Sequence, residues 1–250
     1  MKTHQPDKTK VLIRLSPVRW YHRLKSIGGK VRCNVCGNNF SQFRSFGVPL
    51  RSNAMCPNCY SLESTRVLWF YLSDEVIGKK NKNNFLYFEP ESALLGKLKQ
   101  TSVDIITSNL DYLNSINHLE QGEKLKGGKA DVIIFSHVLE FAEDEEAVFE
   151  ELKRLLRPGG FVLIQTIINW EMDRSYENPS TWEDKDRLNE YFTPGVERIY
   201  GADVAKHLVK AGFKVEVIDY SEQLGSAANS YYRLGNGARE MIFKCKKIKK

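Results

Sequence analysis

Four cysteines near the beginning of the chain are spaced as ligands of a metal ion. Cys33 and Cys36 form one Cys-x-x-Cys pair, and Cys56 and Cys59 form a second pair. Two such pairs fit a tetrahedral site for structural zinc, which orders a segment that has little apolar core of its own. Disulfides are the alternative, but they belong to oxidising compartments. We expect a zinc ribbon whose thiolates leave no open position for water or substrate.

A second group of polar residues follows three short apolar runs. The runs are NFLYF at 84–88, VDIITS at 103–108 and DVIIF at 131–135. In an open α/β sheet, ligands bind at the carboxyl ends of the strands. The residues expected at such ends are Glu89, Pro90, Glu91, Asn109, Asp111, Ser136 and His137.

Within this group, His137 is the side chain that suits proton transfer. An imidazole titrates near neutral pH, so His137 is a candidate catalytic base. The alternative is that His137 only orders its loop by hydrogen bonding to the backbone.

The stretch 131–166 supplies elements that must position these residues. Its first run, DVIIF, is rich in β-branched residues and suits a strand buried on both faces. EEAVFEELKRLL then places apolar side chains on one stripe of an amphipathic helix. RPGG at 157–160 ends that helix, and FVLIQTI predicts a second buried strand. Strand, crossover helix and strand form a βαβ unit, which predicts a parallel sheet.

The remaining chain extends this pattern. Residues 61–76 predict a helix with Ser61 as its N-cap, and strand, helix and strand follow over 84–110. A helix at 202–213 and strands at 214–221 and 239–247 complete the chain, whereas residues 111–130 contain no clear third strand. We expect an α/β fold with a Rossmann-like, mostly parallel seven-stranded sheet and helices on both faces, preceded by the zinc ribbon.

Several segments together resemble one enzyme family. HVLEF at 137–141, the RPGG turn and the EPE turn at 89–91 are similar to class I S-adenosylmethionine-dependent methyltransferases. The similarity is closest to a bacterial group that carries an N-terminal zinc ribbon with four cysteine ligands. The insertion at 169–201 resembles that group through SYENPS at 175–180 and through Arg198 and Tyr200. The resemblance implies that S-adenosylmethionine is the cofactor and that the last strand is antiparallel.

The resemblance also implies roles for single residues. Glu89, in the turn with Pro90 and Glu91, matches the acid near the cofactor's ammonium group. Ser136 and His137 match the loop beside the transferred methyl group.

In the same family an insertion after strand five covers the cleft. This makes Arg198 and Tyr200 candidates for binding an anionic or hydroxyl-bearing acceptor. The alternative is that they hold the insertion in place.

The chain departs from the family at the end of the second strand. The family has a carboxylate there that binds both ribose hydroxyls, whereas this chain has Asn109, with Asp111 two residues later. An amide accepts such a bond only through its carbonyl and brings no charge. Either Asp111 substitutes for the carboxylate, or the affinity for the cofactor is reduced.

The charge and composition limit the location and the partners. The chain is 42% hydrophobic with a net charge of +6, and its first residues are too polar for a secretory signal, so we expect a cytoplasmic protein. No apolar run is long enough for a transmembrane helix. Residues 1–32 hold nine lysines and arginines against one acid. This segment is a candidate surface for nucleic acid or anionic lipid. The alternative is a solvated face that packs on the main domain.

Together these features predict methyl transfer to an oxygen or nitrogen of an acceptor. Residues 1–60 would form the basic segment and ribbon, and 61–250 the methyltransferase-like domain. The similar bacterial group is associated with surface-glycan assembly, which implies a small molecule such as a sugar or glycan precursor. The alternative is a weakly active or non-catalytic binding protein for nucleic acid or a protein partner, because the cofactor segments depart from the family.

Overall fold

A six-stranded sheet forms the centre of the molecule. The structure is a computed structural model that describes residues 27–47, 49–79, 84–120, 124–177 and 196–248. Strands lie in the order β11-β12-β8-β7-β5-β6, and neighbours are parallel from β6 to β8. As expected, the last strand, β12, is antiparallel to both β11 and β8. The strands are β5 Asn84–Phe88, β6 Asp104–Ser108, β7 Ala130–Ser136, β8 Leu156–Gln165, β11 Phe213–Ile218 and β12 Ile242–Lys247.

The prediction of seven strands was wrong by one. The described residues between β6 and β7 form a short helix, α5 (Leu110–Asn114), followed by turns. Among the described residues of this polar stretch, Leu113 and Ile116 are the fully buried apolar side chains, which is too few for a buried strand. β6 is therefore an edge strand, and its Ile106 is 60% exposed.

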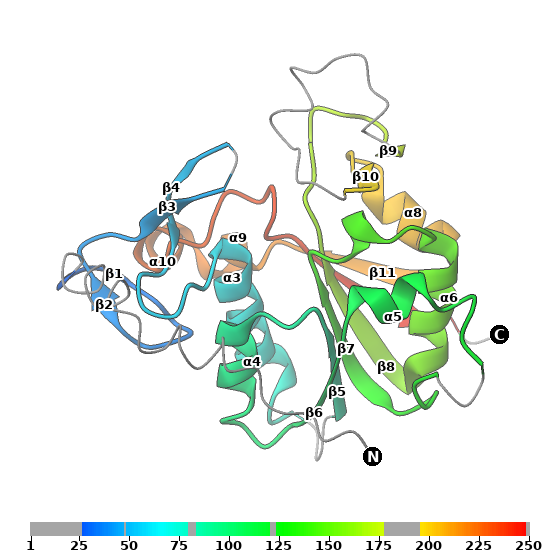
Figure 1. Cartoon of the computed structure of the whole chain (residues 1–250). Helices are drawn as coiled ribbons and strands as arrows, with labels where there is room; N and C mark the ends of the chain where they lie inside the picture. Colours follow the sequence, from blue (N-terminus) through cyan, green and yellow to red (C-terminus); the bar gives the residue numbers. More distant parts are fainter. Residues whose placement is uncertain (1–26, 48, 80–83, 121–123, 178–195, 249–250) are drawn as a thin grey trace.

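Helices cover both faces of the sheet (Figure 1). α6 (Glu145–Leu155) and α8 (Val204–Lys210) pack on one face, and α3 (Glu63–Tyr71) and α4 (Ser92–Leu98) pack on the other. β7 alternates accordingly: Ile133 and Phe135 join the first core, whereas Val132 and Ile134 join the second. The predicted βαβ arrangement is confirmed.

The RPGG segment ends α6 but does not separate it from the next strand. α6 ends at Leu155 and β8 begins at Leu156, so 157–160 forms an irregularity inside the strand. Gly159 has a φ of +83°. At Gly160, an added Cβ would lie 2.8 Å from the backbone oxygen of Ala130. Both glycines are needed, one for its backbone conformation and one for a close approach.

The cysteine-rich part is a small unit of two hairpins, which we call the four-cysteine unit (residues 27–60). β1 (Ile27–Arg32) pairs with β2 (Asn39–Phe40), and β3 (Arg44–Phe46) pairs with β4 (Arg51–Met55). It has its own core, separate from the two cores of the sheet.

A buried arginine joins the four-cysteine unit to the rest of the molecule. Arg66 of α3 is fully buried and donates to the carbonyls of Ala54 and Ser61 at 2.9 and 2.7 Å. It also donates to the carbonyl of Tyr232 at 2.9 Å, at the end of α10 (Ser226–Tyr232). Burial lowers the pKa of Arg66, and the neighbouring cysteines oppose that change.

Four further elements are short. α3 continues into a π-helical turn (η1, Leu72–Val76), and α9 (Tyr220–Leu224) lies between β11 and α10. The described ends of the insertion pair as β9 (Tyr176–Glu177) and β10 (Arg198–Ile199).

Most of the basic segment predicted as a partner surface, and residues 178–195 of the insertion, lie outside the described residues. No helix in the described ranges has the length and apolarity needed to span a membrane.

Candidate active site and metal centre

The four cysteines of the two pairs converge on one point. Their sulfur atoms all lie within 4.8 Å of one another. Cys33 Sγ is 3.6 Å from Cys59 Sγ, and Cys36 Sγ is 3.8 Å from Cys56 Sγ. A tetrahedron of thiolates about 2.3 Å from a zinc ion has edges close to this length. The cluster therefore fits the ion.

Each Cys-x-x-Cys turn is closed by backbone hydrogen bonds. Gly37 N–H donates to Cys33 O at 2.8 Å, and Tyr60 N–H donates to Cys56 O at 3.0 Å. Both donors have positive φ, +76° at Gly37 and +64° at Tyr60. A glycine after the second cysteine therefore suits the first turn, whereas the second turn places a tyrosine in the same conformation.

Ser61 belongs to the cysteine cluster and does not cap α3. Its hydroxyl lies 3.2 Å from Cys33 Sγ and 3.3 Å from Cys59 Sγ. The helix begins at Glu63, and Thr65 Oγ1 accepts from the N–H of Leu62 at 3.1 Å. The predicted N-cap was wrong because the sulfur atoms take the hydroxyl.

The order in which the chain adds strands to the sheet reverses at β5 and β7, which are neighbours. From β5 the chain passes to β6 on one side and then returns to β7 on the other. The residues that follow these two strands, Glu89 and His137, both have positive φ, +44° and +54°. Non-glycine residues rarely adopt this conformation, and such strain is common where a backbone must turn at a ligand site. The predicted binding edge therefore coincides with a switch point of the sheet.

Glu89 and Asn109 interact with the start of α5. Glu89 Oε1 accepts from Leu110 N–H at 2.7 Å, and Asn109 Oδ1 accepts from Tyr112 N–H at 3.0 Å as the N-cap. The carbonyl by which Asn109 could bind a ribose is thus already engaged. Asp111 is exposed, and its carboxylate has no hydrogen-bond partner within the described part of the chain.

The second acid of the turn, Glu91, points toward α3. Its carboxylate accepts a short hydrogen bond from Thr65 Oγ1, and its backbone N–H donates to the Tyr87 hydroxyl at 3.2 Å. Burial raises the pKa of Glu91, and charge interaction with His137 opposes that change. Pro90 lies between the two acids in the same turn.

Behind the turn after β7, His137 and a buried glutamate form a pair. His137 Nδ1 lies 3.3 Å from Glu140 Oε1, and Thr166 donates to Glu140 Oε2 at 2.9 Å. Glu140 is only 2% exposed. Burial lowers the pKa of His137, but Glu140 and Glu91 together raise it by more, so the pKa lies above its usual value of 6.5.

Ser136 supports the loop from inside the sheet. Its hydroxyl donates to Gln165 Oε1 at 3.0 Å, and the amide of Gln165 reaches the carbonyl of Glu240 at 3.2 Å. His137 N–H donates to Gln165 O at 2.8 Å. These bonds fix the backbone from which the His137 side chain extends.

His137 opens into a pocket of about 190 Å³. We call it the His137 pocket. It lies between the four-cysteine unit, the start of α3, the loops after β7 and β8, and the loop before β12. Its lining comprises Phe46, Gly47, Arg51, Leu62, Glu63, Ser64, His137, Glu140, Phe141, Ile167, Arg239 and Glu240.

Sequence reasoning missed most of this pocket. Arg51 and Glu63 come from the four-cysteine unit and α3, and Arg239 and Glu240 precede the last strand. None of them follows a parallel strand, so the pattern that identified Ser136 and His137 could not include them. The only available signal was the glycine-rich sequence LGNGARE at 234–240, which is typical of a loop.

Arg198 and Tyr200 lie outside this pocket and are buried. Arg198 Nη1 donates to the carbonyls of Leu139 and Ala142 at 3.2 and 2.6 Å. The Tyr200 hydroxyl donates to Glu145 Oε1 at 2.6 Å, and burial together with that carboxylate raises its pKa. These contacts favour the alternative that both residues hold the insertion in place.

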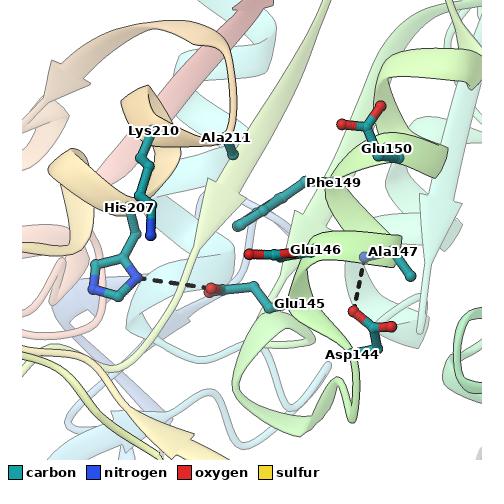
Figure 2. Close-up of a pocket in the computed structure, with 9 residues that line it drawn as sticks. All are labelled: Asp144, Glu145, Glu146, Ala147, Phe149, Glu150, His207, Lys210 and Ala211. Carbon is teal, nitrogen blue, oxygen red and sulfur yellow. Dashed lines mark hydrogen bonds and ion pairs between the residues drawn. The ribbon is translucent and has the colours of Figure 1, made fainter.

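A second pocket, of about 440 Å³, lies between α6 and α8. Figure 2 shows His207 and Lys210 of α8 facing the acidic start of α6. His207 Nδ1 is 3.7 Å from Glu145 Oε2, and Asp144 caps α6 by accepting from Ala147 N–H at 2.9 Å. None of the residues predicted for the site lines this pocket.

Comparisons with known proteins identify the family of the chain. A family model described as a methyltransferase domain matches residues 55–196, more than half of the chain. No curated protein matches this chain.

Solved structures with a similar arrangement include three of low sequence identity. The cyclase SpnF has 12% identity and a TM-score of 0.46, covering 73% of this chain and 81% of that one. A SAM-dependent methyltransferase from Archaeoglobus fulgidus has 13% identity and a TM-score of 0.43, with coverage of 74% and 95%. An S-adenosylmethionine-dependent methyltransferase from Mesorhizobium loti has 15% identity and a TM-score of 0.42, with coverage of 72% and 98%. Likenesses at this level say nothing about the acceptor.

Proposed function

Because the chain belongs to the methyltransferase domain family, we propose that it transfers a methyl group from S-adenosylmethionine to an oxygen or nitrogen of a small molecule bound in the His137 pocket. The observation that carries the proposal is His137 itself. It sits at the switch point, in a strained conformation, paired with a buried glutamate and open to a pocket.

The cofactor site is proposed at the ends of β5 and β6. Glu89 keeps one carboxylate oxygen free of Leu110 N–H and would face the cofactor's ammonium group. Asp111 would take the ribose hydroxyls, since Asn109 is occupied as the N-cap. When bound, the cofactor supplies an electrophilic methyl group on its sulfonium.

The protein's own contribution is alignment and proton removal. His137 would accept the proton of the attacking hydroxyl or amine, and Glu140 would position the imidazole and stabilise it once it is protonated. The bond from Thr166 holds the Glu140 carboxylate in turn. The four-cysteine unit supplies Phe46 and Arg51 to the lining, where they would shield the reacting atoms from water.

We propose zinc as the ion of the four-cysteine cluster, in a structural role. Four sulfur ligands at these separations match its tetrahedral preference. All five cysteines are free of disulfides, which supports a reducing, cytoplasmic location.

We also propose the division between a ribbon ending at residue 60 and a methyltransferase domain from residue 61. The sequence resemblance supports a sugar or glycan precursor as acceptor.

A calorimetric titration with S-adenosylhomocysteine tests the proposal. We expect binding by the unaltered protein and about tenfold weaker binding by Asp111→Asn, because the amide loses the charge that strengthens the ribose bonds. Asp104→Asn is the matched control, since Asp104 is also exposed but begins β6 at the opposite end of the sheet.

The Asp111→Asn and Asp104→Asn variants should have equal thermal stability. Absence of binding at millimolar ligand would instead support the alternative of a binding protein on a methyltransferase-like fold.

A further inference from the structure

The acids that line the His137 pocket already have donors. Glu63 accepts from Arg51 through two nitrogens at 3.1 and 3.4 Å. Glu140 accepts from His137 and Thr166, as described above. Glu240 Oε2 accepts from the N–H groups of Gly237 and Arg239 at 2.9 and 3.1 Å, so its carboxylate is turned into its own loop.

Arg239 differs from these groups. Arg239 lines the same pocket and is partly buried, yet its guanidinium makes no hydrogen bond or ion pair with any described residue. Burial lowers the pKa of Arg239, the nearby Arg51 lowers it further, and Glu240 opposes both. A guanidinium carries five N–H donors in a planar fork. None of the Arg239 nitrogens is a buried donor without a partner, so solvent reaches them and a ligand can replace that solvent. The pocket therefore has unused donors and no matching acceptor among the described residues.

The loop that carries Arg239 is held in place. Ala238 O accepts from Ile168 N–H at 3.0 Å, and Gly237 O accepts from the indole of Trp170 at 3.2 Å. Gly237 itself has a φ of +86°. The amide of Gln165 binds Glu240 O on the other side of Arg239. Because the backbone is fixed on both sides, binding needs to order only the Arg239 side chain and not the loop that carries it.

The rest of the lining suits the body of a small molecule. Phe46 of β3 and Phe141 after β7 provide apolar surface, and Phe46 is 41% exposed. His137 lies in the same lining as Arg239 and is close enough to interact with its charge. An acceptor held at one end by Arg239 would thus have another atom within reach of the imidazole.

We propose that the acceptor carries an anionic oxygen group, a carboxylate or a phosphate, which Arg239 binds in the His137 pocket. This inference rests on the proposed function and narrows its substrate class. Arginine pairs with either group through two parallel N–H···O bonds. A neutral hydroxyl accepts only a single, weaker hydrogen bond and leaves the charge of the guanidinium unpaired.

Binding of three related sugars tests this proposal by ligand-observed NMR. The probes are glucuronate, which has a carboxylate, glucose 6-phosphate, and neutral glucose. At least one anion should bind the unaltered protein about tenfold more tightly than glucose, and Arg239→Gln should remove that difference. Preference for one anion identifies the group that the site takes. Arg174→Gln is the matched control, because Arg174 is exposed on the insertion and outside the lining.

S-adenosylhomocysteine affinity and thermal unfolding are measured on the same proteins. Both should be unchanged in Arg239→Gln, which shows that the variant is folded. Equal binding of glucose and both anions, or anion binding that survives Arg239→Gln, overturns the proposal. Loss of cofactor binding in every protein, with Arg239-dependent anion binding kept, overturns the proposed function and leaves the anion site standing.

Discussion

At the scale of single residues, His137 combines a strained backbone with an ion pair. Its φ is +54°, and its Nδ1 lies 3.3 Å from a carboxylate that is 2% exposed. The neighbouring carboxylates of Glu140 and Glu91 outweigh burial and raise the pKa of the imidazole above 6.5. A base with a raised pKa accepts protons more strongly but is available in its neutral form only at higher pH.

Glu140→Gln should therefore lower the pKa of His137. The substitution removes the partner charge while burial remains, so the imidazole titrates at a lower pH than in the unaltered protein. NMR titration of the imidazole signals measures this directly and needs no acceptor. Glu143→Gln is the control, because Glu143 is an exposed acid of the same loop that contacts Asn114. An unchanged His137 titration in Glu140→Gln would mean that the pair does not set its pKa.

The same pair makes stability depend on pH. Because the pKa of folded His137 is raised, its contribution is complete below about pH 6.5, the usual value for the unfolded chain, and disappears as the pH rises through the folded pKa. The difference in unfolding free energy between the unaltered protein and Glu140→Gln, measured by chemical denaturation, should thus be larger at about pH 6 than at about pH 9.

At the scale of elements, the role of Gly160 in β8 can be tested by comparison with Gly96, a glycine that has free space around it. Gly160→Ala should destabilise the protein by about 1–3 kcal/mol, because its Cβ would lie 2.8 Å from Ala130 O and 3.0 Å from Asp131 O. Gly96→Ala, inside α4, has nothing within 4 Å of the added Cβ. It should stabilise by up to about 1 kcal/mol. Chemical denaturation measures both, and equal effects would contradict this account of β8.

The elements that the sequence predicts are those with a local signal. Buried strands such as β7 are continuous apolar runs, and α6 has a stripe, a cap at Asp144 and a stop at 157–160. The missing third strand was visible as a polar stretch, but the family pattern favoured the count of seven. The cysteine cluster follows from spacing alone. Arg51 and Arg239 reach the His137 pocket only through tertiary packing, which no local pattern of their segments encodes.

At the scale of the whole molecule, the four-cysteine unit has a core of its own and also lines the His137 pocket. Its apolar residues form a separate small core, yet its β3–β4 hairpin supplies Phe46 and Arg51 to the His137 pocket. Arg66 connects the two parts, because its guanidinium binds a carbonyl of the four-cysteine unit and the carbonyls of Tyr232 and Arg233 at the end of α10. Glu89 and Asp111, which we propose bind the cofactor, belong neither to the lining of this pocket nor to the described contacts of Arg66. Metal binding should therefore control the acceptor pocket more than the cofactor site.

Cys56→Ser tests this division. Losing one thiolate should abolish stoichiometric zinc, because the remaining ligands no longer close the site. Hydrogen exchange should then become fast in residues 27–60 and stay slow in β7 and β8, since these strands belong to the cores of the sheet. The affinity for S-adenosylhomocysteine should change by less than about twofold. Cys245→Ser is the control, because Cys245 is buried in β12 outside the cluster and should keep its zinc. Loss of protection across the whole sheet in Cys56→Ser would show that the unit and the sheet fold as one.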